Sequence, residues 1–195
     1  MKIFQEKSIL MLGIPAVFGS AVLAPQIIEI FSGSSFSDAV STARLLSARI
    51  LLSPLNTFAV VNLFIPIGHE KNNLYTTGIA AVMNFLMNLL LIPNLQEYGA
   101  AIATVVAEIV ELVCNLYFVK GLLKIRKLKN NIRNYLLGSV LIVGVCMFFS
   151  QYLIGVLLLS VCVVISVPLY FVVLWFFKDD MMTDIVYRIV RVKIK

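Results

Sequence analysis

The chain has 195 residues, of which 61% are hydrophobic and only 13% charged, and its formal net charge is +6. Soluble domains carry about a quarter charged residues, so a soluble fold of this size cannot bury so many apolar side chains. The cations lie in a few clusters beside apolar runs, which is a signal of membrane topology and argues against a nucleic-acid partner. We therefore expect an all-α integral membrane protein, because lipid offers no partner to unpaired backbone groups.

Six apolar segments are each long enough to cross a bilayer, which takes about 20 residues. The predicted crossings are residues 8–31, 39–67, 74–92 and 99–119, followed by a hairpin over residues 134–177 that folds at 150–155. This organisation gives a four-helix portion over residues 1–120, a basic loop over 121–133, a peripheral hairpin over 134–177 and a basic tail over 178–195. The tail mixes Ile and Val with Arg and Lys, which is typical of a segment lying on anionic lipid headgroups; a partner-binding tail is the alternative.

The distribution of Lys and Arg predicts the orientation. Lys and Arg occur at both termini, in the second–third connection and in the fourth–fifth connection. The alternate connections, around Ser34, Gln96 and Tyr152, contain none. The positive-inside rule then places all the basic segments and both termini in the cytoplasm.

Four charged residues fall inside the predicted crossings: Arg44, Arg49, Glu108 and Glu111. A charge at the centre of a membrane helix costs about 2.5–3.5 kcal/mol, so these side chains are expected to face protein or a water-filled cavity. A rise of about 1.5 Å per residue puts Arg49 and Glu108 at the same depth, near the middle of the bilayer. Arg44 lies closer to the outer surface and can extend to the headgroups.

Helical spacing places polar residues in one stripe on each of three successive crossings. The stripes consist of Thr42, Arg49, Ser53 and Asn56; of Thr77, Ala81, Asn84 and Asn88; and of Thr104, Glu108, Glu111 and Asn115. We interpret them as the lining of a polar cavity, with Arg49, Arg44, Asn56, Asn84, Asn88, Glu108 and Glu111 as candidate substrate-binding residues. Two structural alternatives stay open: amide stripes that only join helices through hydrogen bonds, and a buried Arg49–Glu108 ion pair without a transport role.

No pattern in the sequence indicates covalent chemistry, a metal or a cofactor. The single histidine, His69, lies in a short connection without a Cys or His partner, and the three cysteines lie inside apolar runs without metal-ligand spacing. A glycine-rich phosphate loop, a nucleophile elbow and an HExxH motif are all missing from the sequence. We therefore expect a protein that is not an enzyme and has no metal site.

The stretch from Asn84 and Asn88 through Ile92-Pro93 to Gly99-Ala-Ala-Ile-Ala-Thr104 and Glu108 resembles a known family. It is similar to the C-terminal half of the polysaccharide exporters, the O-antigen and capsule repeat-unit flippases of the multidrug/oligosaccharidyl-lipid/polysaccharide superfamily. Three shorter matches accompany it: the Gly13-Ile-Pro15 of the first crossing, its exit over residues 30–36, and the turn over residues 68–71. The resemblance covers about residues 8–120, and the last hairpin matches only in hydropathy.

The resemblance implies a MATE-like fold in which two helix bundles enclose a cationic lumen. It also implies a polyprenyl-pyrophosphate-linked oligosaccharide as cargo and the cytoplasmic membrane of a bacterium as location. Members of the family have about twice as many helices, so we expect this chain to be a fragment, a split subunit or a remnant that needs a missing N-terminal portion or a second chain. The alternatives are a multidrug or cation antiporter of the same superfamily and a non-transporting membrane scaffold.

Overall fold

The computed structural model describes residues 2–119, 129–177, 179 and 181–183, and every described element is helical. Five of its helices are long and apolar enough to cross a membrane. The elements are α1 (Lys2–Ser32), η1 (Ser34–Phe36), α2 (Ala39–Leu46), α3 (Arg49–Phe58), η2 (Ala59–Phe64), η3 (Ile65–Ile67), α4 (Glu70–Phe118), α5 (Lys129–Phe149) and α6 (Gly155–Phe176). The prediction of an all-α membrane protein is confirmed. The predicted basic loop and basic tail lie largely outside the described residues.

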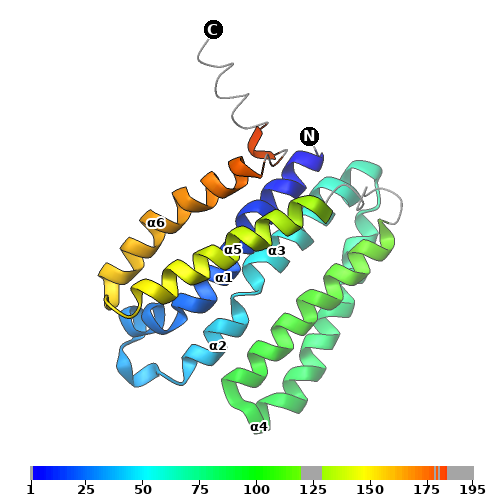
Figure 1. The fold of residues 1–195 in the computed structure, drawn as a ribbon. Helices are drawn as coiled ribbons and strands as arrows, with labels where there is room; N and C mark the ends of the chain where they lie inside the picture. The colour runs from blue at the N-terminus through cyan, green and yellow to red at the C-terminus, as the bar shows by residue number, and fades with distance from the viewer. Residues whose placement is uncertain (1, 120–128, 178, 180, 184–195) are drawn as a thin grey trace.

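The longest element, α4, is a hairpin of two helices. Gln96 has φ 49° and ψ −128°, a non-helical conformation that reverses the chain inside the 49-residue α4. We call residues 70–95 its first arm and residues 97–118 its second arm. The described helices therefore make six crossings, with the turn where the sequence analysis expected it, after Pro93 (Figure 1).

The second crossing, predicted over residues 39–67, is divided into several helical elements. The chain passes from α2 to α3 through Ser47 and Ala48, where the Ala48 N–H donates to the Leu45 carbonyl three residues back instead of four (3.2 Å). The π-helical turn η2 and the 3₁₀ turn η3 then complete the crossing. Gly68 ends it with φ 72°, a left-handed conformation that glycine adopts without steric cost. The break matters for function because α3 begins at Arg49.

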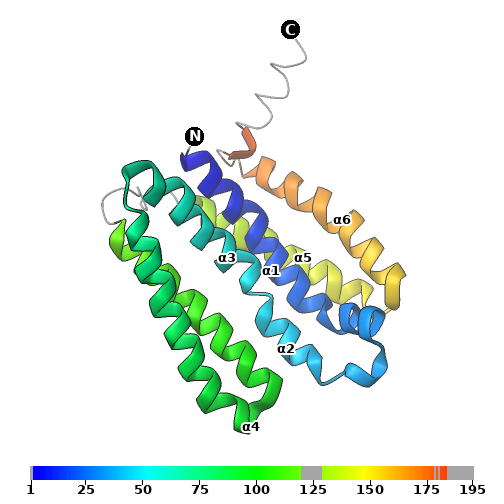
Figure 2. The same cartoon turned by 180° about the vertical axis from the view of Figure 1, so that it is seen from behind.

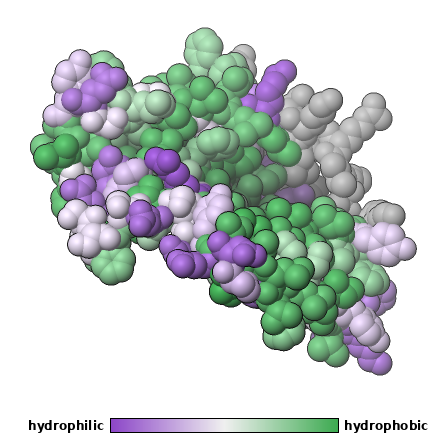
Figure 3. All heavy atoms as spheres, turned by 90° about the horizontal axis from the view of Figure 1, so that it is seen from below, coloured by the Kyte–Doolittle hydropathy of each residue, from purple (hydrophilic) through white to green (hydrophobic). Residues whose placement is uncertain are grey.

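The helices form two layers on either side of α1 (Figure 2). On one side α5 and α6 pack against α1, and their shared core includes Met11, Ile14, Ile142, Leu158 and Leu174, all buried. On the other side α2 and α3 lie between α1 and the α4 hairpin. Seen from the end that carries the α4 turn, polar residues gather in patches between extensive hydrophobic areas (Figure 3). A surface that is mostly hydrophobic, with its polar side chains confined to patches, is typical of a protein surrounded by lipid.

A buried polar cluster closes the opposite end of the α5–α6 layer, and the sequence analysis did not anticipate it. The carboxylate of Asp179, which is 2% exposed, accepts hydrogen bonds from Asn131 Nδ2 (2.8 Å), the Tyr135 hydroxyl (3.4 Å) and the Met181 N–H (3.0 Å). Asn131 and Tyr135 belong to α5, and Asp179 follows α6. The cluster therefore ties the exit of the last crossing to the start of α5.

Candidate substrate-binding face

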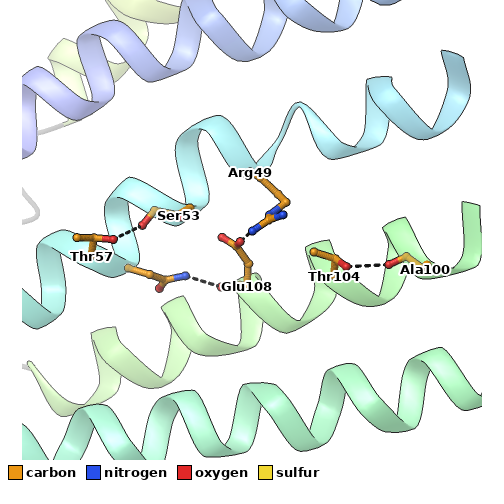
Figure 4. Close-up of polar contacts among 7 residues, drawn as sticks. Arg49, Ser53, Thr57, Ala100, Thr104 and Glu108 are labelled. Carbon is orange, nitrogen blue, oxygen red and sulfur yellow. Dashed lines mark hydrogen bonds and ion pairs between the residues drawn. The ribbon is translucent and has the colours of Figure 1, made fainter. Parts of the chain in front are cut away.

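The candidate site lies where α3 faces the second arm of α4. The Nε–H of Arg49 donates to Glu108 Oε1 at 2.8 Å, and the two side chains point toward one another across the gap between the helices (Figure 4). The two residues therefore lie at the same level along the bundle. The two partners differ in burial, because the side chain of Arg49 is 49% exposed and that of Glu108 only 14%. The carboxylate is the fixed inner end of the pair, and the guanidinium is its outer end.

A second hydrogen bond joins α3 to the second arm of α4, about two helical turns after Arg49 along α3. The Nδ2 group of Asn56 donates to the backbone carbonyl of Glu108 at 3.1 Å. The Oδ1 atom of Asn56 accepts from Asn115 Nδ2 at 3.1 Å, and Asn115 is fully buried. Asn56 and Arg49 are seven residues apart and share one face of α3, as the stripe predicted. Both residues therefore hold α3 against Glu108: Arg49 binds the Glu108 side chain, and Asn56 binds the Glu108 backbone.

Glu111 belongs to a separate contact between the two arms of α4. Its Oε1 atom accepts from the Thr77 hydroxyl at 3.0 Å, and the same hydroxyl lies 3.3 Å from Asn73 Oδ1. Within the part of the chain that the structure describes, Glu111 has no cationic partner. The site thus contains two carboxylates, of which one is paired with an arginine and the other is held by a hydroxyl.

These groups surround a cavity of about 260 Å³ between α3, η2 and α4. Its polar lining consists of Ser53, Asn56, Thr57, Asn73, Glu108 and Glu111. Two buried acceptor atoms of this region, Glu108 Oε2 and Asn115 Oδ1, have no hydrogen-bond partner among the described residues. The cavity is therefore rich in oxygen acceptors, and Arg49 is not one of the residues that line it.

The structure brings together four of the seven predicted residues, namely Arg49, Asn56, Glu108 and Glu111. The other three lie elsewhere. Arg44 is exposed near the end of α2, on the far side of the helix break. Asn84 and Asn88, on the first arm of α4, bond to each other at 2.8 Å (Asn88 Nδ2 to Asn84 Oδ1) and do not line this cavity.

Sequence reasoning overlooked Asn73, which precedes the predicted third crossing by one residue and lines the cavity beside Glu111. Its position i−4 from Thr77 was the available signal, because it extends the polar stripe of that helix by one turn. Residues of all three predicted polar stripes form contacts between helices. Thr77, Asn115 and Asn56 all make the inter-arm or interhelical hydrogen bonds that such stripes provide.

Chemically, the half-exposed guanidinium of Arg49 can bind an anion by hydrogen bonds and charge, whereas the acceptor-lined cavity suits hydrogen-bond donors or a cation. The arrangement does not assemble a nucleophile with a base, and no group of three or more His, Cys, Asp or Glu residues suited to a metal ion occurs among the described residues. Arginine is suited to phosphate because its planar guanidinium presents several N–H groups in a fixed geometry. An exposed guanidinium on a membrane-embedded polar face therefore indicates recognition of a charged solute.

Comparison with known proteins finds similarity to flippases. The sequence profile of the lipid II flippase MurJ family matches residues 5–173. The chain is also similar to the probable low-salt glycan biosynthesis flippase Agl15 of Haloferax volcanii, with 27% identity over 154 residues. That match covers 75% of this chain but 31% of the relative, so the chain spans about a third of the relative's length. No solved structure matches the chain.

These similarities refine the resemblance seen in the sequence. The expectation of a flippase family for lipid-linked glycans is confirmed, whereas the O-antigen and capsule branch is not the one that the comparison identifies. The matched range runs from the first turns of α1 into α6 and includes every residue of the candidate site. By this match, the chain belongs to the lipid II flippase MurJ family.

Proposed function

We propose that the chain forms part of a flippase that moves a lipid-linked oligosaccharide, carried on a polyprenyl pyrophosphate, across the cytoplasmic membrane of a bacterium for surface polysaccharide synthesis. The chain supplies one wall of the path and performs no covalent chemistry. The observation that carries this proposal is the state of Arg49. Its guanidinium is half exposed at the depth of Glu108, on a polar face of an otherwise apolar bundle.

The energetics of the membrane support a transport role for this face. Ionisable groups at this depth are expensive and typically mark the path of a solute. A purely structural ion pair gains most when both partners are buried and form two parallel bonds. Arg49 instead makes a single bond to Glu108 and leaves half of its surface open.

The path needs a second wall. The α3–α4 face is one side of a bundle, and cargo bound at Arg49 requires groups opposite it. We propose that these come from a further portion of the same transporter or from a second chain, as the short coverage of the relative suggests. The basic segments and both termini face the cytoplasm in this arrangement.

An export assay tests the proposal. The chain is expressed in cells that lack their own lipid-linked glycan flippase, alone and together with the remaining portion of a matching transporter, and surface glycan is measured against the amount of membrane-inserted protein. We expect export only from the combined proteins, and a strong loss in Arg49→Ala and Arg49→Lys, since lysine keeps the charge but lacks the planar fork. Full export by the combined proteins carrying Arg49→Ala would contradict the proposal.

A second candidate is a cation antiporter of the same superfamily. The observation that favours it is Glu111, a carboxylate in the cavity that a hydroxyl holds in place of a cation. An antiporter predicts that Glu111→Gln abolishes transport while Arg49→Ala preserves it. The flippase predicts the reverse order of severity, so glycan export and cation efflux measured on both variants separate the two functions.

A further inference from the structure

We propose that Glu108 is a positioning residue, which holds Arg49 by its Nε atom so that the outer edge of the guanidinium is presented to phosphate groups of the cargo. This inference rests on the proposed function, because it assumes an anionic cargo. It assigns Glu108 a role through Arg49 and not a contact with the cargo.

The first support is the atom that makes the contact. A guanidinium has two bonding edges, one formed by Nε with a terminal nitrogen and one formed by the two terminal nitrogens. The structure uses Nε alone, at 2.8 Å from Glu108 Oε1. Within the described part of the chain, the terminal nitrogens of Arg49 have no hydrogen-bond partner, and the side chain as a whole is 49% exposed. The edge that binds a phosphate end-on therefore stays open.

The second support is the difference in burial between the two side chains. A pair that only neutralised charge would close into two parallel bonds, since both partners gain from it in a low dielectric. Here the Oε2 atom of Glu108 is buried and has no partner among the described residues. The carboxylate thus accepts a hydrogen bond from Nε only and leaves the edge formed by the two terminal nitrogens unbound.

The third support is that Glu108 is itself held in place. Asn56 donates to the Glu108 backbone carbonyl, and Asn115 in turn donates to Asn56. Arg49 and Asn56 lie on the same face of α3, so two bonds to one residue fix this helix against the second arm of α4.

Two substitutions separate position from charge. Glu108→Gln keeps the length of the side chain and its Oε1 acceptor but removes the charge. Glu108→Asp keeps the charge but withdraws the oxygen by one methylene from Nε. Glu111→Gln is the matched charge control, because Glu111 lies one turn away and bonds to Thr77 and not to Arg49.

The readout is the rate at which phenylglyoxal modifies Arg49, measured by mass spectrometry on membranes that contain the full chain, with and without inorganic pyrophosphate. Arg44 is the internal control, since it is exposed on α2 and separate from the site. We expect pyrophosphate to slow modification of Arg49 roughly tenfold in the unaltered chain, in Glu108→Gln and in Glu111→Gln. In Glu108→Asp we expect the protection to be lost, while the reactivity of Arg44 stays the same in all proteins.

Three results would overturn the inference. Protection that persists in Glu108→Asp would show that the reach of the carboxylate does not matter. Protection that increases in Glu108→Gln but not in Glu111→Gln would make Glu108 a competitor of the anion. Absence of protection in the unaltered chain would remove the anion from Arg49 altogether. The export assay with Arg49→Ala decides the proposed function independently, so failure of the positioning role and failure of the flippase role are distinguishable.

Discussion

The hydroxyl of Tyr170 on α6 donates a hydrogen bond of 2.7 Å to the backbone carbonyl of Met11 on α1. In a regular α-helix the N–H four residues later would occupy this carbonyl, but residue 15 is a proline and has no N–H. Tyr170 therefore replaces the hydrogen bond that Pro15 removes. Because lipid supplies no alternative donor, this contact makes the proline tolerable in the middle of a membrane helix.

Tyr170→Phe should destabilise the bundle by about 1–3 kcal/mol, since it leaves the buried Met11 carbonyl without a partner. The loss should be much smaller in the background of Pro15→Ala, where residue 15 regains the N–H for that carbonyl. Unfolding of the four proteins of this double-mutant cycle, followed by circular dichroism in mixed micelles, measures the coupling. Tyr152→Phe is the control at an exposed tyrosine. Equal losses from Tyr170→Phe in both backgrounds would show that the hydrogen bond does not act as described.

Gly138→Ala should disrupt the packing of α5 on α6. A Cβ atom at Gly138 would lie 2.6 Å from Tyr170 Cε2, so the ring would have to shift and take its hydroxyl away from Met11. Overpacking of this kind costs about 1–3 kcal/mol. The matched control is Gly144→Ala on the same helix, where an added Cβ meets nothing within 4 Å. The midpoint of thermal unfolding should fall for Gly138→Ala and hold or rise for Gly144→Ala; a similar fall in both would contradict the packing argument.

Gly99→Ala should open the turn of α4. A Cβ atom there would lie 2.7 Å from the carbonyl oxygen of Leu91 and 2.8 Å from its carbonyl carbon, and backbone atoms cannot move aside as a flexible side chain can. We expect the two arms to separate. A disulfide between cysteines placed at Thr77 and Glu111 should therefore form in lower yield in this variant than in Gly78→Ala. Gly78 has open space around its Cβ position. Unchanged cross-linking in Gly99→Ala would show that the turn tolerates the methyl group.

Asp179→Ala should loosen the end of the α5–α6 layer. Removal of the carboxylate takes away the acceptor of the buried Asn131 amide, at a cost of about 1–3 kcal/mol, and one hydrogen bond of the Tyr135 hydroxyl. Hydrogen exchange at the first turns of α5 should accelerate, while that of the α4 hairpin should stay unchanged. Asp38→Ala serves as the control, because Asp38 is exposed at the start of α2. Equal exchange in both variants would exclude the proposed tie.

The topology makes a further prediction. Cysteines introduced at Ser34 and Gln96 should react with a membrane-impermeant maleimide only from outside the cell, and a cysteine at His69 only from the cytoplasm. Ser34 begins η1 and Gln96 forms the turn of α4, and both of these segments lie at one end of the bundle, whereas the connection from η3 to α4, which contains residue 69, lies at the other (Figure 1). Labelling of Gln96 and His69 from the same side would invalidate the six-crossing arrangement.

Hydropathy and proline positions were sufficient to predict the crossings of this chain. The turn after Pro93 and the reversal between Phe149 and Gly155 occur where apolar runs exceed the thickness of a bilayer. Counting residues along the second and fourth crossings, which run in the same direction, also placed Arg49 at the level of Glu108, because the rise of an α-helix is nearly constant.

Contacts between distant segments were not accessible in the same way. The break before Arg49 leaves no mark in the sequence, since Ser47 and Ala48 are compatible with a regular helix. The last hairpin looked peripheral because its polar residues were mostly small, yet Tyr170 joins it to α1 across 159 positions of sequence. Whether a given hydroxyl reaches a given carbonyl depends on how two packed helices are rotated and shifted relative to one another. Neither quantity can be read from a single sequence.

The bond between Tyr170 and Met11 also constrains how this chain can diverge. A lineage that replaces Pro15 by an ordinary residue no longer needs a hydroxyl at position 170, whereas one that loses the hydroxyl first is left with an unpaired carbonyl in lipid. The order of the two changes is therefore not symmetric in evolution: position 15 should change before position 170. Among relatives, phenylalanine at the second position should be found chiefly where proline is missing from the first.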